Sequence, residues 1–200
     1  MNFLISIVIL LFSVVIHEVS HGLMADYLGD PTARYAGRLT LNPINHLDPL
    51  GSIILPLVLF FTNSPILVGW AKPVPINPYN LRDQRFGPAK VALAGPMSNI
   101  LVAIFFALLI RFVGVYISSS LLMIFAFITQ VNLMLAIFNL MPVPPLDGSH
   151  IFFGLFPSLE EKSRIFFSQF GIIFLIFFIF FIFPLIFPVI NFLFNLLTGY

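Results

Sequence analysis

The sequence predicts an all-α protein that crosses a membrane several times, and its composition and its long uncharged stretches are the observations behind this fold class. Of its 200 residues, 60% are apolar and 8% are charged, whereas a soluble domain carries about 25% charged residues. Polar groups are therefore too few to cover the surface, and lipid must cover it. A spanning helix needs roughly 20 apolar residues, and uncharged stretches that approach or exceed this length lie near the start of the chain and at 49–71, 91–110, 112–146 and 165–200. We expect about four to five membrane segments.

The first apolar stretch begins at about Leu4 and carries no charge as far as Ile16. It lacks the basic n-region and the small-residue cleavage site of a signal peptide, so we expect it to be retained. After it, the alternation of apolar and polar residues over 33–41 predicts a short strand or hairpin, a small β element after the first helix. Residues 70–87 are too rich in proline and polar groups to form a spanning helix. The charges within 157–168 are typical of an interfacial segment.

We expect a single integral-membrane domain over 1–200, with its core over 1–151 and a C-terminal apolar segment over 165–200. Pro184 and Pro188 can kink that segment or split it into two parts. The chain has no cysteine, which excludes disulfides, cysteine-ligated zinc and iron–sulfur clusters. The formal net charge of +1 argues against nucleic acid as a partner. The oligomeric state stays open.

The strongest chemical signal is the pentapeptide HEVSH inside the first apolar helix. His17 and His21 are four residues apart, so on a helix they differ by about 40° around the axis and both rings project from one face. Two such imidazoles can bind one metal ion, and Glu18 lies beside them, where it can act on a metal-bound water. We therefore expect a zinc site within the lipid-embedded part of the protein.

A third ligand is expected far downstream, within residues 139–148. A catalytic zinc site uses three protein ligands and keeps water in the fourth position. Asp147 is the only charged residue between Arg111 and Glu160, and an isolated carboxylate at membrane depth needs a cationic or metal partner. Prolines break the preceding helix, and Gly148 lets the backbone turn or approach the metal. Because unwound backbone in a bilayer must be buried by protein or reached by water, we expect a polar cavity around Asp147.

Together these motifs resemble the site-two protease family of intramembrane zinc metalloproteases. The matching patterns are H-E-x-x-H at 17–21, G-P-x-x-N at 95–99 and N-x-x-P-x-x-P-L-D-G at 139–148. The segment GWAKPVPINP at 69–78 resembles a compact prokaryotic branch of that family. The resemblance covers nearly the whole chain to about Ile151, and it does not constrain the phenylalanine-rich tail.

The resemblance implies a zinc metalloendopeptidase that cleaves transmembrane segments of membrane proteins, as in regulated intramembrane proteolysis. One Zn²⁺ per chain is expected on the two histidines of HEVSH and on Asp147. Glu18 is expected to be the general base, and the resemblance suggests Asn139 as a substrate-binding or oxyanion-side residue. The expected partners are the lipid bilayer and a substrate helix, which must unwind locally before cleavage. A spare β-edge at 33–41 or at 69–76 could bind the unwound chain by β-augmentation.

The metal site also constrains the topology. HEVSH lies toward the C-terminal end of the first helix, and Asp147 lies just past the end of a helix expected over about 121–141, so these two ends must share one membrane side. This requires 49–71 to be a re-entrant hairpin, broken at Pro56 and at 63–65, rather than a full span. Every lysine and arginine except Arg111 then lies on the metal side, which the positive-inside rule makes cytoplasmic. We expect a multi-pass protein of the cell membrane with its active site toward the cytoplasm.

Other interpretations stay open at this point. The chain could be a non-proteolytic metal-binding membrane protein or a transporter, although it shows no inverted repeat of the kind that many transporters have. It could also be a binder that retains the fold without the activity. We ascribe His46 to loop order rather than to a catalytic role, and His150 to the membrane interface rather than to binding the metal or a metal ligand. For Asn99, helix packing and support of the site are equally good explanations, and Asn132 is expected to form an interhelical hydrogen bond.

Overall fold

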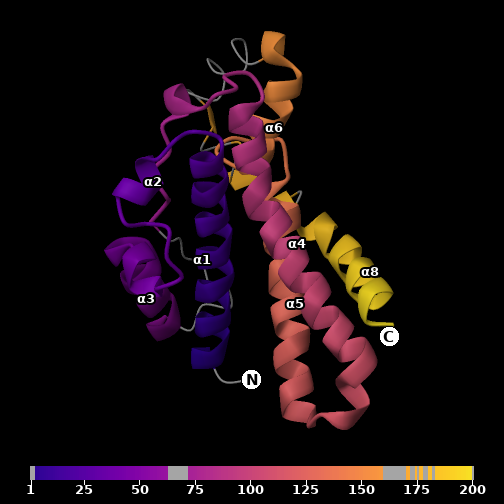
Figure 1. Ribbon diagram of the computed structural model, residues 1–200. Coiled ribbons are helices and arrows are strands. Elements are labelled where there is room, and N and C mark those ends of the chain that lie inside the picture. Colours follow the sequence, from indigo (N-terminus) through magenta and orange to yellow (C-terminus); the bar gives the residue numbers. More distant parts are fainter. Residues whose placement is uncertain are drawn as a thin grey trace.

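The structure is a computed structural model that describes residues 3–62, 72–159, 170–171, 174, 176–177, 180–181 and 183–199. Helices are the only regular elements in these described ranges (Figure 1). Three of them are long and apolar enough to cross a membrane, namely α1 (Phe3–Tyr27), α4 (Gly87–Val113) and α5 (Ser119–Asn139). The expected helical, polytopic membrane protein is therefore confirmed. The total of four to five membrane segments stays a prediction, because much of the C-terminal stretch lies outside the described residues.

A buried polar network joins the three long helices. Asn132 Nδ2 of α5 donates a hydrogen bond to Ser13 Oγ of α1 over 2.9 Å, and Asn99 Nδ2 of α4 donates to Asn132 Oδ1 over 2.8 Å. All three side chains are buried. In lipid, interhelical hydrogen bonds and close contact between small residues hold helices together, because lipid tails are as apolar as leucine. The small side chains of Ala103 and Ala107 on α4 are fully buried as well. The expected interhelical hydrogen bond of Asn132 is confirmed.

The prediction of a small β element over 33–41 is wrong. The described chain there contains the helix α2 (Thr32–Tyr35), a turn and an irregular segment. The cause is Asp30, whose buried carboxylate accepts hydrogen bonds from the backbone amide of Thr32, over 3.1 Å, and from the Thr32 hydroxyl. A side-chain oxygen that satisfies a free amide at the start of a helix favours a helical turn there. The alternating pattern of the sequence is outweighed by this local interaction.

The chain between α1 and α4 leaves and returns at one end of the bundle. Asn99 of α4 lies beside Ser13 of α1 and Val91 lies beside His21, so the two helices are antiparallel. The described connecting elements after α2 are η1 (Pro43–His46), η2 (Pro49–Ile54), α3 (Leu55–Phe61) and η3 (Pro78–Asn80). Each of them is too short to span a bilayer, as a re-entrant hairpin over 49–71 requires. The rest of that hairpin, from residue 63, lies outside the described residues, so the hairpin stays a prediction.

Beyond α5 the chain unwinds and then begins a new helix, α6 (Asp147–Leu155). The intervening segment 140–146 contains three prolines, which cannot continue a helix. Gly148 lies so close to the preceding turn that a Cβ atom there would overlap the backbone oxygens of Leu140 and Met141. This close approach sets the start of α6 and, with it, the position of Asp147.

In the C-terminal apolar stretch, a short turn and the start of a helix lie at Pro184 and Pro188. The short turn η6 (Phe183–Ile186) precedes α8 (Phe187–Thr198), and Pro188 lies in the first turn of α8, where a helix tolerates proline. Ile186 and Ile190 are buried together with Leu133 of α5. Helix α8 packs against α4 and α5, on the side of them away from α3 (Figure 1).

Replacement of Gly148 by alanine is expected to displace the start of α6. The added Cβ would overlap two backbone carbonyl groups that cannot move independently, so we expect the midpoint of thermal unfolding in detergent to fall by roughly 5–10 °C. The matched control is Gly37→Ala, because nothing lies within 4 Å of a Cβ at that position and only its φ of 65° opposes alanine. Equal losses of stability in the two variants would contradict the close approach at Gly148.

Candidate metal centre

Helices α1 and α6 bring three potential metal ligands together. His17 and His21 are one turn apart on α1 and each is 6% exposed, and Asp147 is the first residue of α6. Asp147 Oδ2 lies 3.0 Å from His17 Nε2 and 3.3 Å from His21 Nε2, and the two Nε2 atoms are 3.0 Å apart. The fold therefore gathers these three side chains, which the sequence separates by more than a hundred residues, at a single point.

The hydrogen bonds of the two imidazoles fix the tautomer of each ring. His17 Nδ1 donates to Asn99 Oδ1 over 2.6 Å, and His21 Nδ1 donates to the backbone oxygen of Val91 over 2.7 Å. Because both partners are acceptors, the proton of each neutral ring is on Nδ1 and the lone pair is on Nε2. The lone pairs of both rings therefore point toward Asp147 Oδ2, which is itself buried without a hydrogen-bond partner among the described residues.

Three electron-pair donors this close repel one another unless a cation lies between them. Zinc binds histidine nitrogen and carboxylate oxygen at about 2.0–2.2 Å with tetrahedral geometry, which separates neighbouring ligand atoms by roughly 3.3–3.6 Å. The separations of 3.0–3.3 Å in the structure lie at or just below the lower limit of this range. The donor set and its spacing thus fit one divalent cation, with three protein ligands and one position left for another ligand.

The structure explains why position 95 of α4 is a glycine. A Cβ atom at Gly95 would lie 2.6 Å from His17 Nε2 and would overlap the ring of His21. Only glycine lets the backbone of α4 lie against both imidazoles. The G-P-x-x-N pattern contains this signal, because Asn99, one turn beyond Gly95, binds His17. Asn99 therefore both packs the helices and orients a proposed ligand.

A cavity of about 370 Å³ opens beside the three potential ligands. Glu18, Asn139 and His150 are in its wall, so the cavity contains both residues to which the sequence assigns catalytic roles. Asn139 Nδ2 donates to the backbone oxygen of Leu135 over 3.0 Å within α5. His150 is exposed and lies outside the group of three side chains whose donor atoms are within 4.8 Å of one another. The expected cavity beside Asp147 is present, and its wall combines these polar side chains with apolar ones such as Val74 and Leu81.

His46 lies away from this cavity and orders a loop. It is fully buried, and its Nε2 atom bonds to the backbone oxygen of Thr40 over 2.8 Å. Its own backbone oxygen accepts a hydrogen bond from the amide of Lys72 over 2.9 Å. The interpretation of His46 as a loop-ordering residue is confirmed.

Residues 72–77, which we call the strap, form part of the cavity wall and bind Glu18. The backbone amide of Val74 donates to Glu18 Oε2 over 3.0 Å. Arg38 Nη2 donates to the backbone oxygens of Lys72 and Pro73 at one end of the strap, over 3.1 and 3.2 Å. The strap is extended but is no strand, and its prolines remove the amides that a pairing edge needs. The predicted β-edges therefore have no strand in 33–41 or in 72–76, and residues 69–71 of the second one lie outside the described residues.

Asp30 anchors the other end of the strap. Its Oδ2 atom accepts a hydrogen bond from the Asn77 amide over 2.6 Å, and its Oδ1 atom accepts one from Asn80 Nδ2 over 2.9 Å. Burial alone would raise the pKa of Asp30, but hydrogen bonds from Thr32, Asn80 and Asn77 outweigh it and hold the pKa below its ordinary value. Asp30 is therefore a carboxylate at neutral pH. Sequence reasoning missed this role of Asp30, because the hydrogen bond joins it to a residue 47 positions further along the chain.

Comparison with known proteins extends the similarity beyond these motifs. The model of Peptidase family M50 matches residues 111–183. A protein of Bacillus subtilis (strain 168) named "Putative zinc metalloprotease YwhC" is 38% identical over 158 residues, which are 76% of this chain and 68% of that protein. Rip2 of Mycobacterium tuberculosis (strain ATCC 25618 / H37Rv), which has the same description, is 29% identical over 83% of this chain and 62% of its own length. No solved structure matches the chain.

An archaeal protein is also similar. MJ0611 of Methanocaldococcus jannaschii, which shares the zinc metalloprotease description, is 43% identical over 63 residues, or 31% of each chain. The chain covers 68% of YwhC but 62% of Rip2, so these relatives are longer than the region they share with it. The identity to YwhC over more than two thirds of both proteins is far more than a shared metal motif. The resemblance to the site-two proteases is thereby confirmed, and the chain belongs to peptidase family M50.

Proposed function

We propose that this chain is an intramembrane zinc metalloprotease that cleaves transmembrane segments of membrane proteins. The observation that carries the proposal is the convergence of two imidazole nitrogens and one carboxylate oxygen, 3.0–3.3 Å apart, inside a bundle of membrane-spanning helices. His17 is ten residues from the Tyr27 end of α1, which is about 15 Å along the helix. A peptide bond cleaved there lies within the depth of a bilayer, whose hydrocarbon core is about 30 Å thick.

In the proposed hydrolysis, the side chains bind and orient the metal ion, and the metal ion activates the peptide carbonyl and a water molecule. His17 Nε2, His21 Nε2 and Asp147 Oδ2 hold one zinc ion per chain. Zinc at this position supplies a Lewis acid for the peptide carbonyl and for a water molecule. The hydrogen bonds from the rings to Asn99 and to the Val91 backbone keep both lone pairs directed at the ion.

Glu18 is the general base of this proposal. It accepts the proton of the attacking water and returns it to the leaving amine. The Val74 amide fixes one of its carboxylate oxygens over 3.0 Å, so the other oxygen is available for the proton. Asn139 lies in the same cavity, where its amide can bind the substrate backbone on the oxyanion side.

The substrate must offer an unwound backbone. In a helix the carbonyl groups are hydrogen-bonded and shielded, and unsatisfied backbone in lipid is costly. The wall of the cavity beside Glu18 includes polar side chains that can form hydrogen bonds with an unwound segment. Cleavage within the bilayer is the chemistry of regulated intramembrane proteolysis, in which a membrane-anchored protein is released.

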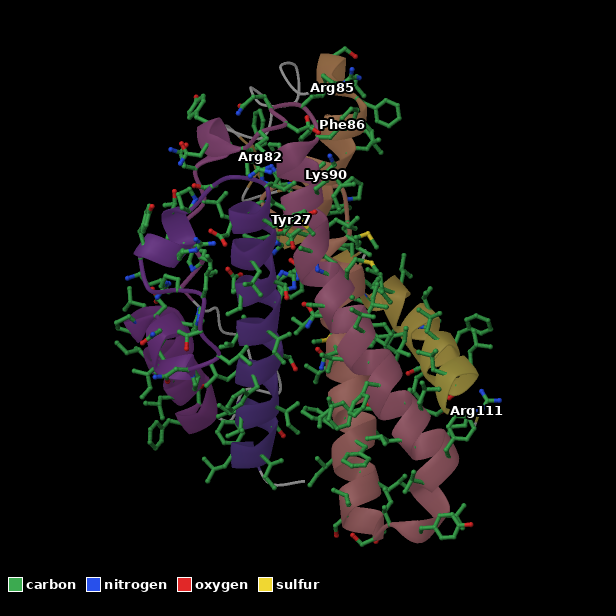
Figure 2. The ribbon with its side chains drawn as sticks, in the orientation of Figure 1. Tyr27, Arg82, Arg85, Phe86, Lys90 and Arg111 are labelled. Atoms are coloured by element: carbon green, nitrogen blue, oxygen red, sulfur yellow. The ribbon has the colours of Figure 1, made fainter. Side chains whose placement is uncertain are left out.

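The distribution of basic residues supports a cytoplasmic active site. Arg82, Arg85 and Lys90 lie at the end of the bundle where α1 ends, whereas Arg111 lies at the far end of α4 (Figure 2). Basic residues are concentrated in cytoplasmic segments of membrane proteins. The metal end of α1 therefore faces the cytoplasm of a cell membrane, and the Phe3 end faces outward.

Orientation can be measured with a reporter inserted at Tyr79, which is 88% exposed in the connection before α4. Because this connection lies at the metal end, we expect alkaline phosphatase inserted there to be inactive and green fluorescent protein to be fluorescent. The control insertion is at Val115, which is 90% exposed at the opposite end and should give the reverse pattern. An active phosphatase at position 79 would overturn the orientation.

Replacement of Glu18 by glutamine is expected to abolish cleavage while zinc remains bound. The substitution removes the proton acceptor but none of the three ligands, so activity should fall at least about 100-fold at an unchanged zinc content. The measurement compares new N-termini inside transmembrane segments, by mass spectrometry of membranes from cells that express each variant, with the zinc content of the purified proteins.

The matched control is Asp83→Asn, which neutralises a carboxylate at the same end of the bundle but outside the cavity, where it pairs with Lys90. It should cleave like the wild type. The same set of new N-termini in the wild-type and Glu18→Gln samples would refute the protease assignment and favour a non-proteolytic metal protein.

A further inference from the structure

The buried polar network that joins α1, α4 and α5 has a fixed direction, because two backbone carbonyl groups set it. Asn99 Nδ2 of α4 donates to the backbone oxygen of Ser13 over 3.2 Å. Asn132 Nδ2 of α5 donates to the backbone oxygen of Ile128 over 2.9 Å. A carbonyl oxygen can accept a hydrogen bond but cannot donate one. Each amide therefore turns its nitrogen toward this carbonyl group and its own oxygen the other way.

The direction of these amides extends to the metal centre. Because Asn132 Nδ2 faces Ile128, its Oδ1 atom faces Asn99 and accepts a hydrogen bond from Asn99 Nδ2 over 2.8 Å. The Oδ1 atom of Asn99 is left for His17 Nδ1, which lies 2.6 Å away. An amide oxygen accepts, so the ring proton is on Nδ1 and the lone pair is on Nε2, the atom that faces Asp147. Groups on α4 and α5 therefore set the tautomer of a proposed ligand on α1.

The network is buried, and every amide atom in it has a partner. Both N–H groups of Asn99 and both of Asn132 have acceptors, and the second acceptor of Asn132 is Ser13 Oγ over 2.9 Å. Asn99 and Asn132 have no exposed surface, and Ser13 is 3% exposed. Water from outside therefore does not replace a partner that is lost, and the loss of one group leaves its neighbour unsatisfied in the interior of the bundle.

Helix packing does not by itself require this direction of the amides. A hydrogen bond between Asn99 and Asn132 holds α4 against α5 in either orientation of the two amides. The reverse orientation would present Nδ2 of Asn99, a donor, to His17. Nδ1 of the ring would then have to accept, and the ring proton would be on Nε2, where it blocks metal binding. The orientation in the structure is the one that leaves the lone pair of Nε2 to a metal ion.

We propose that Asn132 is a positioning residue of the zinc site, which acts through Asn99 to fix the direction and the tautomer of the His17 ring. This inference rests on the metal site of the proposed function but not on proteolysis. Asn132 bonds to Asn99 and Ser13 rather than to the ring itself. Because coupling is reciprocal, zinc on His17 also strengthens the attachment of α5 to the other two helices. The packing of α5 and the affinity of the site for zinc thus depend on each other.

The test measures the dissociation constant for zinc of the purified full chain in detergent, by competition with a fluorescent zinc chelator. Loss of a direct hydrogen-bond partner of a ligand typically weakens metal binding about 10–100-fold, and we expect this of Asn99→Leu. Asn132→Leu has a similar side-chain volume but no acceptor for Asn99 Nδ2. It should raise the dissociation constant roughly threefold to tenfold, because the Ser13 backbone oxygen still holds the Asn99 amide. Far-UV circular dichroism reports whether each variant is folded.

Thr129→Val is the matched control. Thr129 is fully buried on α5, three residues before Asn132, but its hydroxyl donates to the backbone oxygen of Phe125 over 2.9 Å within its own helix. This variant should bind zinc like the wild type. In the double variant Asn99→Leu/Asn132→Leu, the second substitution should add nothing, since Asn132 acts through Asn99. Equal zinc affinities of Asn132→Leu and Thr129→Val, or effects of Asn99→Leu and Asn132→Leu that multiply, would overturn the proposal.

Ser13→Ala gives a second test if Asn132→Leu does not fold. It removes the Oγ atom that accepts a hydrogen bond from Asn132 Nδ2. We expect a smaller rise in the dissociation constant for zinc, about twofold to fivefold, and an unchanged value would contradict the proposal. The outcome for the proposed function is separate. Zinc binding that persists unchanged in Asp147→Ala would remove the proposed metal site, whereas wild-type zinc affinity in Asn132→Leu would remove the positioning role alone.

Discussion

The structure depends on holding two imidazole nitrogens and one carboxylate oxygen 3.0–3.3 Å apart in the interior of a lipid-embedded bundle. Without a cation such an arrangement is electrostatically unfavourable, so the surrounding chain must enforce it. Asn99 and the Val91 backbone fix the two rings, Gly95 gives them room, and Gly148 brings Asp147 to them. These features lie on different parts of the chain, and together they hold the three side chains of the proposed ion site.

Because a bilayer offers few hydrogen-bond partners, the polar groups of this protein form hydrogen bonds with one another. Asn99 and Asn132 satisfy each other between helices, and the strap satisfies Glu18 through the amide of Val74. Asp30 holds the end of the strap from a position just beyond α1. Polar groups that hold the site are thus bonded to other parts of the chain.

The amino-acid sequence alone was sufficient to predict those features of the fold and the site that depend on residue type and spacing. The helical spacing of HEVSH and the isolation of Asp147 in an uncharged stretch indicated a shared metal site, and the prolines before Asp147 indicated the break after α5. Patterns of alternation were less reliable, because the carboxylate of Asp30 starts a helical turn where a strand was expected. The G-P-x-x-N pattern marked Gly95, but its fit against the rings, like the course of the strap, depends on contacts between segments that are distant in the sequence.

X-ray absorption spectroscopy at the zinc edge, on the purified full chain, tests the central claim most directly. The account predicts one zinc ion per chain with two imidazole nitrogens and oxygen ligands at about 2.0–2.2 Å, and loss of this signal in Asp147→Ala. Zinc bound without imidazole, or an unchanged spectrum after loss of the Asp147 carboxylate, would contradict it.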